Sequence, residues 1–196
     1  MRKFLALFAA LFALTLVAAC GDNGMEGMDH GSSKSNSSSK SADRNAADVK
    51  FAQEMIPHHG QAIEMAKLAT TRASSPEVKT LAQRIEGAQD PEIKTMSEWL
   101  KAWGEDIPAA DMGSMAGHDS MSGMMSANDM AKLEKASGAE FDRMFVEMMI
   151  RHHQGATEMA KTELKDGKNT KPKELAAQIE KAQTAEIGEM QALVNG

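Results

Sequence analysis

Hydrophobic positions recur at helical spacing along two long stretches of the chain, residues 45–103 and 127–195. A turn signal divides each stretch into two amphipathic segments. The spacing predicts four helices, at about residues 45–71, 75–103, 137–167 and 172–194. Because both turns are short, each pair of helices should form an antiparallel hairpin. We therefore predict an all-α fold, an antiparallel four-helix bundle built from two helical hairpins.

Several helix ends have their own signals. Pro76 is typical of the first turn of a helix. Ser137 and Glu140 have the spacing of a capping box, so the third helix should begin there. Gly167 should end that helix, and Pro172 should open the last one.

Two prolines, Pro57 and Pro91, fall inside predicted helices. A proline there removes a backbone hydrogen bond and clashes with the preceding turn. We expect a kink at each.

The two hairpins are copies of one another. Residues 51–67 match residues 145–161 at an offset of 94 positions (145 − 51), without a gap. The match continues at Leu81/Leu175, Ile85/Ile179, Glu86/Glu180, Ala88/Ala182, Gln89/Gln183, Glu92/Glu186, Ile93/Ile187 and Met96/Met190. Such a match indicates a duplication. With each hairpin antiparallel, we expect the first helices of the two copies to run parallel, with matched residues at similar height.

Residues 1–19 have the pattern of a secretory signal peptide, with Arg2 and Lys3 before an uncharged apolar run. That run is shorter than the roughly 18 residues a spanning helix needs. The small residues that end at Cys20 resemble a bacterial lipobox. We expect an exported lipoprotein, anchored to a bacterial membrane through lipid on Cys20, in the periplasm or at the cell surface.

Composition completes the division of the chain. Residues 20–44 are rich in Gly, Ser, Asp, Lys and Asn and are expected to form a disordered tether. The predicted bundle, residues 45–196, comprises repeat one at 45–103, a Met-rich linker at 104–126 and repeat two at 127–196.

Charge and cysteine content exclude two kinds of site. The net charge is −6, and loss of Arg2 and Lys3 with the leader makes it −8 (−6 − 2), which argues against a nucleic-acid partner. Cys20 is the only cysteine, so the chain has neither an intrachain disulfide nor a thiolate metal site. Methionine, by contrast, is unusually frequent, with 17 residues.

A His-His pair recurs on one face of the first helix of each copy, flanked by methionines at equal spacing. The candidate ligands are Met55, His58, His59 and Met65, with Met149, His152, His153 and Met159. Thioethers favour Cu(I), and imidazole suits copper, zinc and nickel. The alternative is a set of hydrogen-bonded core histidines beside core methionines. The duplication of the whole pattern favours metal ligation.

Glu92 and its equivalent Glu186 fall on the apolar face of the second helix in each copy. A buried carboxylate needs a partner. We expect each to accept a hydrogen bond from an imidazole or to bind the metal directly, unless it lies at the rim of the face.

The linker holds a Met-x-x-Met series with one histidine: Met112, Met115, His118, Met121, Met124 and Met125. Gly and Ser rule out a stable element here, so these methionines should have no core to enter. Exposed methionine is prone to oxidation. A role as additional metal ligands is therefore the better interpretation.

The motif Phe-x3-Met-Ile-x-His-His-x2-Ala-x2-Met-Ala, followed by Gln-x2-Glu-Ile-x2-Met, resembles domain-of-unknown-function family 305. The resemblance covers residues 45–103 and 127–195. It implies a ferritin-like helical bundle that binds copper through Met and His and supports copper resistance. The Met-rich linker is not part of the family motif.

Three functions compete at this point. The first is binding and sequestration of copper ions, as Cu(I) with Cu(II) or Ag(I) as further possibilities, by a protein that is not an enzyme. The second is a di-metal oxidase, but Glu54 and Glu147 lack the Glu-x-x-His spacing to His58 and His152 that this chemistry uses. The third is a structural module at the cell surface. We favour the first; the sequence names no delivery partner.

Overall fold

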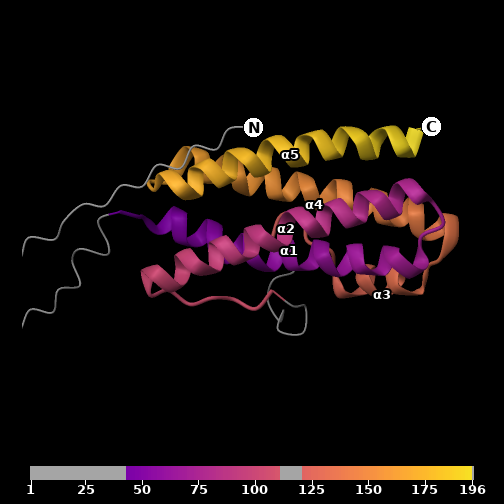
Figure 1. Cartoon of the computed structure of the whole chain (residues 1–196), viewed down its shortest axis with the longest axis horizontal. Helices are drawn as coiled ribbons and strands as arrows, with labels where there is room; N and C mark the ends of the chain where they lie inside the picture. Colours follow the sequence, from indigo (N-terminus) through magenta and orange to yellow (C-terminus); the bar gives the residue numbers. More distant parts are fainter. Residues whose placement is uncertain (1–42, 111–120, 196) are drawn as a thin grey trace, which may run out of the picture. The chain divides into compact units, whose positions relative to one another are not determined.

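The computed structural model describes residues 43–110 and 121–195, and these residues form helices and loops without a strand (Figure 1). The helices are α1 (Ala46–Arg72), α2 (Pro76–Trp103), α3 (Ala127–Lys135), α4 (Gly138–Asp166) and α5 (Thr170–Asn195). The all-α prediction is confirmed, with the four long helices close to their predicted ranges. None of the described helices is long and apolar enough to cross a membrane.

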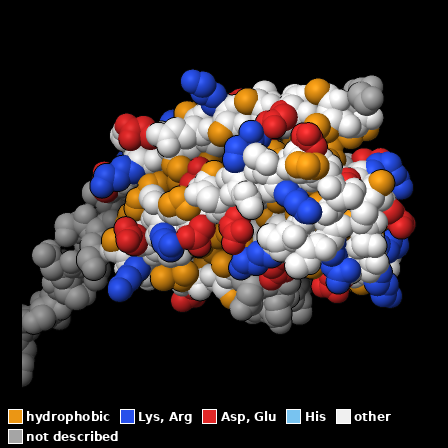
Figure 2. Space-filling view, turned by 45° about the vertical axis from the view of Figure 1, so that its right-hand side comes forward, with side chains coloured by type: hydrophobic (Ala, Val, Ile, Leu, Met, Phe, Trp, Pro, Cys, Tyr) orange, Lys and Arg blue, Asp and Glu red, His pale blue; other side chains and the backbone are white. Residues whose placement is uncertain are grey.

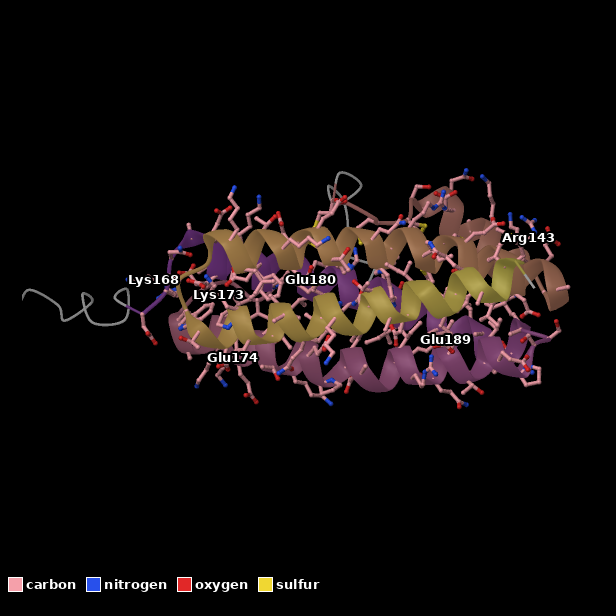
Figure 3. The ribbon with its side chains drawn as sticks, turned by 90° about the horizontal axis from the view of Figure 1, so that it is seen from above. Arg143, Lys168, Lys173, Glu174, Glu180 and Glu189 are labelled. Atoms are coloured by element: carbon pink, nitrogen blue, oxygen red, sulfur yellow. The ribbon has the colours of Figure 1, made fainter. Side chains whose placement is uncertain are left out.

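The four long helices form two hairpins. Helix α2 packs on α1, α5 packs on α4, and α1 and α4 make the main contact between the hairpins. An ion pair between Arg84 of α2 and Glu189 of α5 joins the two outer helices. Figure 3 shows α5 alongside α2, with Glu189 labelled on α5.

Helices α1 and α4 run antiparallel, so the predicted parallel arrangement is wrong. The backbone N–H of Ser74, just after α1, donates to Asp142 at the start of α4. At the other end, Asp48 in the first turn of α1 accepts from the N–H of Lys168, just after α4. The reason is the connection between the copies, which carries the chain back along the bundle before α4 begins (Figure 1).

Helix α3 lies in this connection and was not predicted. The hydroxyl of Ser126 accepts from the N–H of Asp129 and caps its first turn. Met130 and Leu133 are its buried residues. Nine residues give too few turns for a periodic hydrophobic pattern, so only the Ser-x-x-Asp capping signal could have found it.

Neither internal proline breaks its helix. Helix α1 continues through Pro57 and α2 continues through Pro91. The local cost of an internal proline, about 3 kcal/mol, is offset because both helices are packed against neighbours on either side of it.

The capping box lies elsewhere than predicted. Ser137 makes no side-chain cap bond, and Gly138, which follows it, has φ of +63°. The box is at the start of α1, where Asn45 accepts from backbone N–H groups and the Asp48 carboxylate accepts from the Asn45 N–H at 2.6 Å.

The buried interior is divided into two apolar cores. One core surrounds Met65, Leu81 and Phe145, and the other surrounds Phe51 and Leu100. A layer of buried polar side chains belongs to neither core: His58, His59, Gln61, Gln89, His152, His153 and Gln183. The outer surface, in contrast, carries interspersed acidic and basic side chains (Figure 2). Buried polar groups in mid-bundle are costly unless they are partnered.

Candidate metal centre

The two His-His pairs meet at the middle of the bundle. His58 and His59 lie near the midpoint of α1, and His152 and His153 lie near the midpoint of α4. Mid-helix residues come to the same level even when two helices run antiparallel. All four side chains are fully buried, and the ring centroids of His58 and His152 are 3.8 Å apart. The duplicated pairs thus share one layer.

The second helix of each hairpin supplies a carboxylate to this layer, as the sequence led us to expect. Nε2 of His59 lies 2.7 Å from Oε2 of Glu92, and Nε2 of His153 lies 2.7 Å from Oε2 of Glu186. The side chains of Glu92 and Glu186 are 21% and 19% exposed. Each carboxylate therefore connects a buried imidazole to the edge of the bundle.

These contacts define which nitrogen carries the proton on three rings. In a neutral ring, a nitrogen that donates to an oxygen holds the hydrogen, and the other nitrogen keeps its lone pair. Nε2 of His58 donates to the carbonyl oxygen of Ser122 at 3.2 Å. Together with the two carboxylate bonds, this leaves Nδ1 of His58, His59 and His153 as free acceptors. Such a second partner on a ligating imidazole is usual at metal sites.

Five buried imidazole nitrogens have no hydrogen-bond partner among the protein atoms. They are Nδ1 of His58, His59 and His153 and both ring nitrogens of His152. Leaving a buried polar atom unpaired costs about 1–3 kcal/mol, so a folded protein rarely keeps several together without a reason. A bound ligand that accepts nitrogen lone pairs supplies such a reason.

Burial keeps the two facing rings neutral. It is the main cause that lowers the pKa of His58 to about 3, with the neighbouring His59 adding to the effect. Burial, followed by the charge of His58, holds the pKa of His152 well below its usual value of 6.5. Neutral imidazole is the form that binds a metal.

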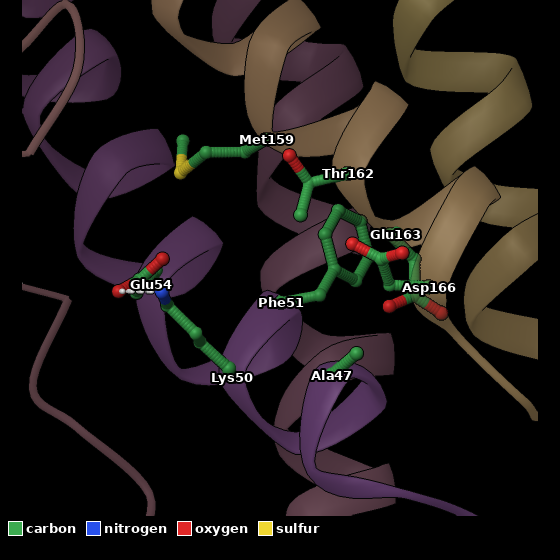
Figure 4. Close-up of a pocket in the computed structure, with 8 residues that line it drawn as sticks. All are labelled: Ala47, Lys50, Phe51, Glu54, Met159, Thr162, Glu163 and Asp166. Carbon is green, nitrogen blue, oxygen red and sulfur yellow. Dashed lines mark ion pairs between the residues drawn. The ribbon is translucent and has the colours of Figure 1, made fainter.

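The predicted methionine ligands lie on both sides of the histidine layer. Met55, Met65 and Met149 are fully buried, whereas Met159 is partly exposed. Met55 and Met159 belong to one apolar core, and Met65 and Met149 belong to the other. Figure 4 shows Met159 at a pocket that Glu54 also lines, so it lies farther from the interior than the other three.

Within residues 43–110 and 121–195, no three His, Cys, Asp or Glu side chains converge on one point. In this conformation, one ion at the facing rings of His58 and His152 can have two imidazole ligands. Thioether sulfur of the flanking methionines is a further donor of the kind that a soft ion prefers. That composition fits a soft ion better than a hard one.

The ends of the linker lie directly on α1 and α4 beside this layer. A Cβ atom on Gly60 would lie 1.7 Å from the carbonyl oxygen of Ala110. A Cβ atom on Gly155 would lie 2.0 Å from the carbonyl oxygen of Ser122. Glycine at these two positions lets the linker backbone lie directly on α1 and α4. The contact at Gly155 places the carbonyl oxygen of Ser122 within hydrogen-bond distance of His58.

Met125 corrects the expectation that the linker methionines have no core to enter. Its side chain is 5% exposed and belongs to an apolar core. The side-chain amide of Gln61 donates to its carbonyl oxygen at 2.9 Å and accepts from its N–H at 2.7 Å. Met121 and Met124 are partly exposed. Met112, Met115 and His118 lie outside the described residues, as does Cys20.

Three buried glutamines, Gln61, Gln89 and Gln183, were not singled out from the sequence. Only the identity of Gln89 and Gln183 at matched positions of the repeat pointed to them. Gln61 has no such signal, because glycine is its equivalent in the second copy.

The chain belongs to the family described as a domain of unknown function, DUF305, which matches residues 48–194. It is similar to a solved DUF305 structure from Streptomyces coelicolor, with 32% identity and a TM-score of 0.67 over 75% of this chain and 91% of that chain. It is similar also to a DUF305 structure from Deinococcus radiodurans, with 30% identity and a TM-score of 0.69 over 77% of this chain and 97% of that chain. It is also similar to CopM in its Cu(II)-bound form (33% identity, TM-score 0.64, 76% and 95%). CopM has further structures with Cu(I) and with Ag. No curated protein matches the chain.

Proposed function

We propose that this protein binds copper between α1 and α4, in the layer where the two His-His pairs meet. The observation that carries the proposal is the contact of His58 with His152, two fully buried neutral rings with unpaired nitrogens. The similarity to CopM, which has been solved with Cu(I), Cu(II) and Ag, supports the choice of metal. Copper is here the ion that the protein binds and holds, and not the cofactor of a reaction.

The donors favour Cu(I), with Ag(I) as a close analogue. Two imidazoles and the flanking buried thioethers form a small set of ligands, and all of them are soft or borderline donors. The hydrogen bonds of Nε2 to Glu92, Glu186 and Ser122 fix the orientation of three of the rings. We further propose that the linker methionines Met112, Met115, Met121 and Met124, with His118, hold additional ions.

Binding is favoured over catalysis. A di-metal oxidase of the ferritin-like kind uses a Glu from each of two helices and Glu-x-x-His from the other two. The described residues contain no convergent group of three such ligands. The two carboxylates of the layer, Glu92 and Glu186, are already bonded to histidines.

The cellular role follows from the leader. We propose that the protein is exported, is held at a bacterial membrane through lipid on Cys20, and sequesters copper outside the cytoplasm as part of metal resistance. The tether of residues 20–44 would separate the bundle from the membrane.

The test is an anaerobic titration of the protein with Cu(I) against a competing chelator. The wild type is compared with a His58→Ala, His59→Ala variant and with a linker variant in which serine replaces Met112, Met115, His118 and Met121. Met125 is retained because it belongs to a core. Tight binding that survives in the linker variant and is lost in the histidine variant is the expected result. Equal stoichiometry and affinity in all three would sink the proposal.

A further inference from the structure

A small cavity lies at the seam between α2 and α5, beside the histidine layer. Its volume is about 20 Å³, and it is lined by four residues of α2 and four of α5. Gln89 and Glu92 come from α2, and Gln183 and Glu186 come from α5. A space of this size holds one water molecule or one small ion.

The two walls of the cavity are the same four residues, once from each repeat. Every lining residue of α2 has its identical partner in α5 at the offset of 94 positions. Ala88 and Ala182 are both exposed, so packing does not require that the two copies keep the same residue at this position. Neighbouring exposed positions have diverged, for example Asp90 and Thr184. The seam has thus kept the same side chains in both copies.

Two of the residues that line the cavity carry a buried oxygen atom without a partner. Gln89 and Gln183 are each 3% exposed, and the Oε1 atom of each has no partner among the protein atoms. Glu92 and Glu186 each give Oε2 to a histidine. Their other carboxylate oxygens remain available. Two buried amide oxygens and two carboxylates in one small space favour a positive ion.

Away from the seam, the ends of the linker cover part of the histidine layer. Backbone lies directly on Gly60 and Gly155 there, and the Ser122 carbonyl covers His58. At the seam, by contrast, the partly exposed side chains of Glu92 and Glu186 extend from the surface to the buried rings. A metal ion that reaches the seam is one carboxylate away from His59 and His153.

We propose that the α2–α5 seam is an oxygen-lined cation site through which the metal ion enters the histidine layer. The inference rests on the proposed copper-binding function. Amide and carboxylate oxygens attract the ion by charge but hold Cu(I) less well than imidazole and thioether do. The site therefore passes the ion inward.

The test measures how fast Cu(I) is transferred from a coloured chelator complex to the full chain, by anaerobic stopped flow. The variant is Gln89→Leu with Gln183→Leu, which removes both amide oxygens and leaves the histidines and their carboxylate partners intact. The matched control is Gln83→Leu with Gln178→Leu, at exposed positions of the same helices. Transfer should slow about tenfold or more in the variant. Equilibrium affinity, and the rate in the control, should stay near wild type.

An unchanged transfer rate in the variant, with wild-type affinity, would overturn the entry site and leave the copper function standing. Faster transfer in a Gly155→Ala protein, whose linker is displaced from α4, would also overturn it by placing the entry on the linker side. A variant that melts at a lower temperature than the control but takes up Cu(I) at the wild-type rate would also overturn it, because the amide oxygens would then have only a structural role. Absence of Cu(I) uptake by the wild type would remove the proposed function itself.

Discussion

His58 of α1 and His152 of α4, equivalent residues of the two repeats, face each other at the centre of the bundle with ring centroids 3.8 Å apart. Two equivalent residues in direct contact must lie close to the axis that relates the hairpins. The duplication has therefore brought two copies of one imidazole together, which places one candidate ligand from each hairpin in direct contact with the other.

Substitution His152→Phe should stabilise the metal-free protein and abolish its stabilisation by metal. Both ring nitrogens of His152 are buried without a partner, and phenylalanine of similar shape removes that cost. The gain should be about 1 kcal/mol or more in the free energy of unfolding. Urea unfolding with and without Ag(I) measures both effects. A loss of several kcal/mol in the metal-free state would mean that His152 holds the core together.

Substitution Gly155→Ala should displace the linker from α4. The added methyl would lie 2.0 Å from the Ser122 carbonyl oxygen, and backbone cannot yield as a flexible side chain does. We expect a loss of about 1–3 kcal/mol in the free energy of unfolding. Gly87→Ala is the control, because nothing lies within 4 Å of the position that the added Cβ atom would take. The control should gain about 0.5–1 kcal/mol in the free energy of unfolding, since alanine stabilises a helix relative to glycine. Equal effects of the two changes would contradict the packed linker.

Met125 and Met124, neighbours in the linker, should differ in their roles. Truncating the core residue Met125 to alanine should cost about 2–5 kcal/mol in the free energy of unfolding. Met124→Ala, at a partly exposed position, should cost much less and should reduce the number of ions bound. Thermal unfolding and a Cu(I) titration of each variant separate the two effects. If Met125→Ala instead reduced the number of bound ions and left the stability unchanged, Met125 would again be a candidate linker ligand.

The four long helices and the histidine–carboxylate pairs could be predicted from the sequence, whereas the remaining features depended on contacts between residues far apart in the chain. Helical periodicity located the four long helices, and the repeat located both His-His pairs and the carboxylates that bond them. The relative direction of α1 and α4 depended on the path of the linker, which carries no periodic signal. The burial of Met125 depended on a bond to Gln61, 64 positions away, that composition cannot reveal.

Glu163, near the end of α4, should make the stability depend on pH. It is 1% exposed. Burial is the main cause that raises the pKa of Glu163 to about 8, and the neighbouring Asp48 adds to it. Asp48 is itself buried, but backbone hydrogen bonds, the strongest from Asn45, outweigh burial and lower its pKa. A hydrogen bond between the two carboxyls therefore requires a proton on Glu163, whose side chain Figure 4 shows at the pocket wall.

Because the folded-state pKa of Glu163 lies above its usual value of 4.5, this residue keeps a proton in the folded protein that it loses in the unfolded chain between pH 4.5 and about 8. Below pH 6.5 the buried neutral rings of His58 and His152, whose pKa values are lowered, act in the opposite direction. The free energy of unfolding should therefore fall as pH rises from 6.5 to about 8, by at most about 1.4 kcal/mol per pH unit. Glu163→Gln should flatten the profile, since its amide can donate to Asp48 at any pH. Glu174→Gln, on the exposed side of α5, should leave the profile unchanged. A flat wild-type profile would contradict the buried acid pair.

The most direct test of the copper centre is X-ray absorption at the copper edge of the protein loaded with one equivalent of Cu(I). The account predicts scattering from imidazole rings together with sulfur in the wild type. The imidazole component should disappear in a His58→Phe, His152→Phe variant, in which both facing imidazoles are replaced by aromatic rings without a nitrogen ligand. A wild-type spectrum of sulfur ligands alone, unchanged by the double substitution, would place the first copper ion outside the histidine layer and contradict the central claim.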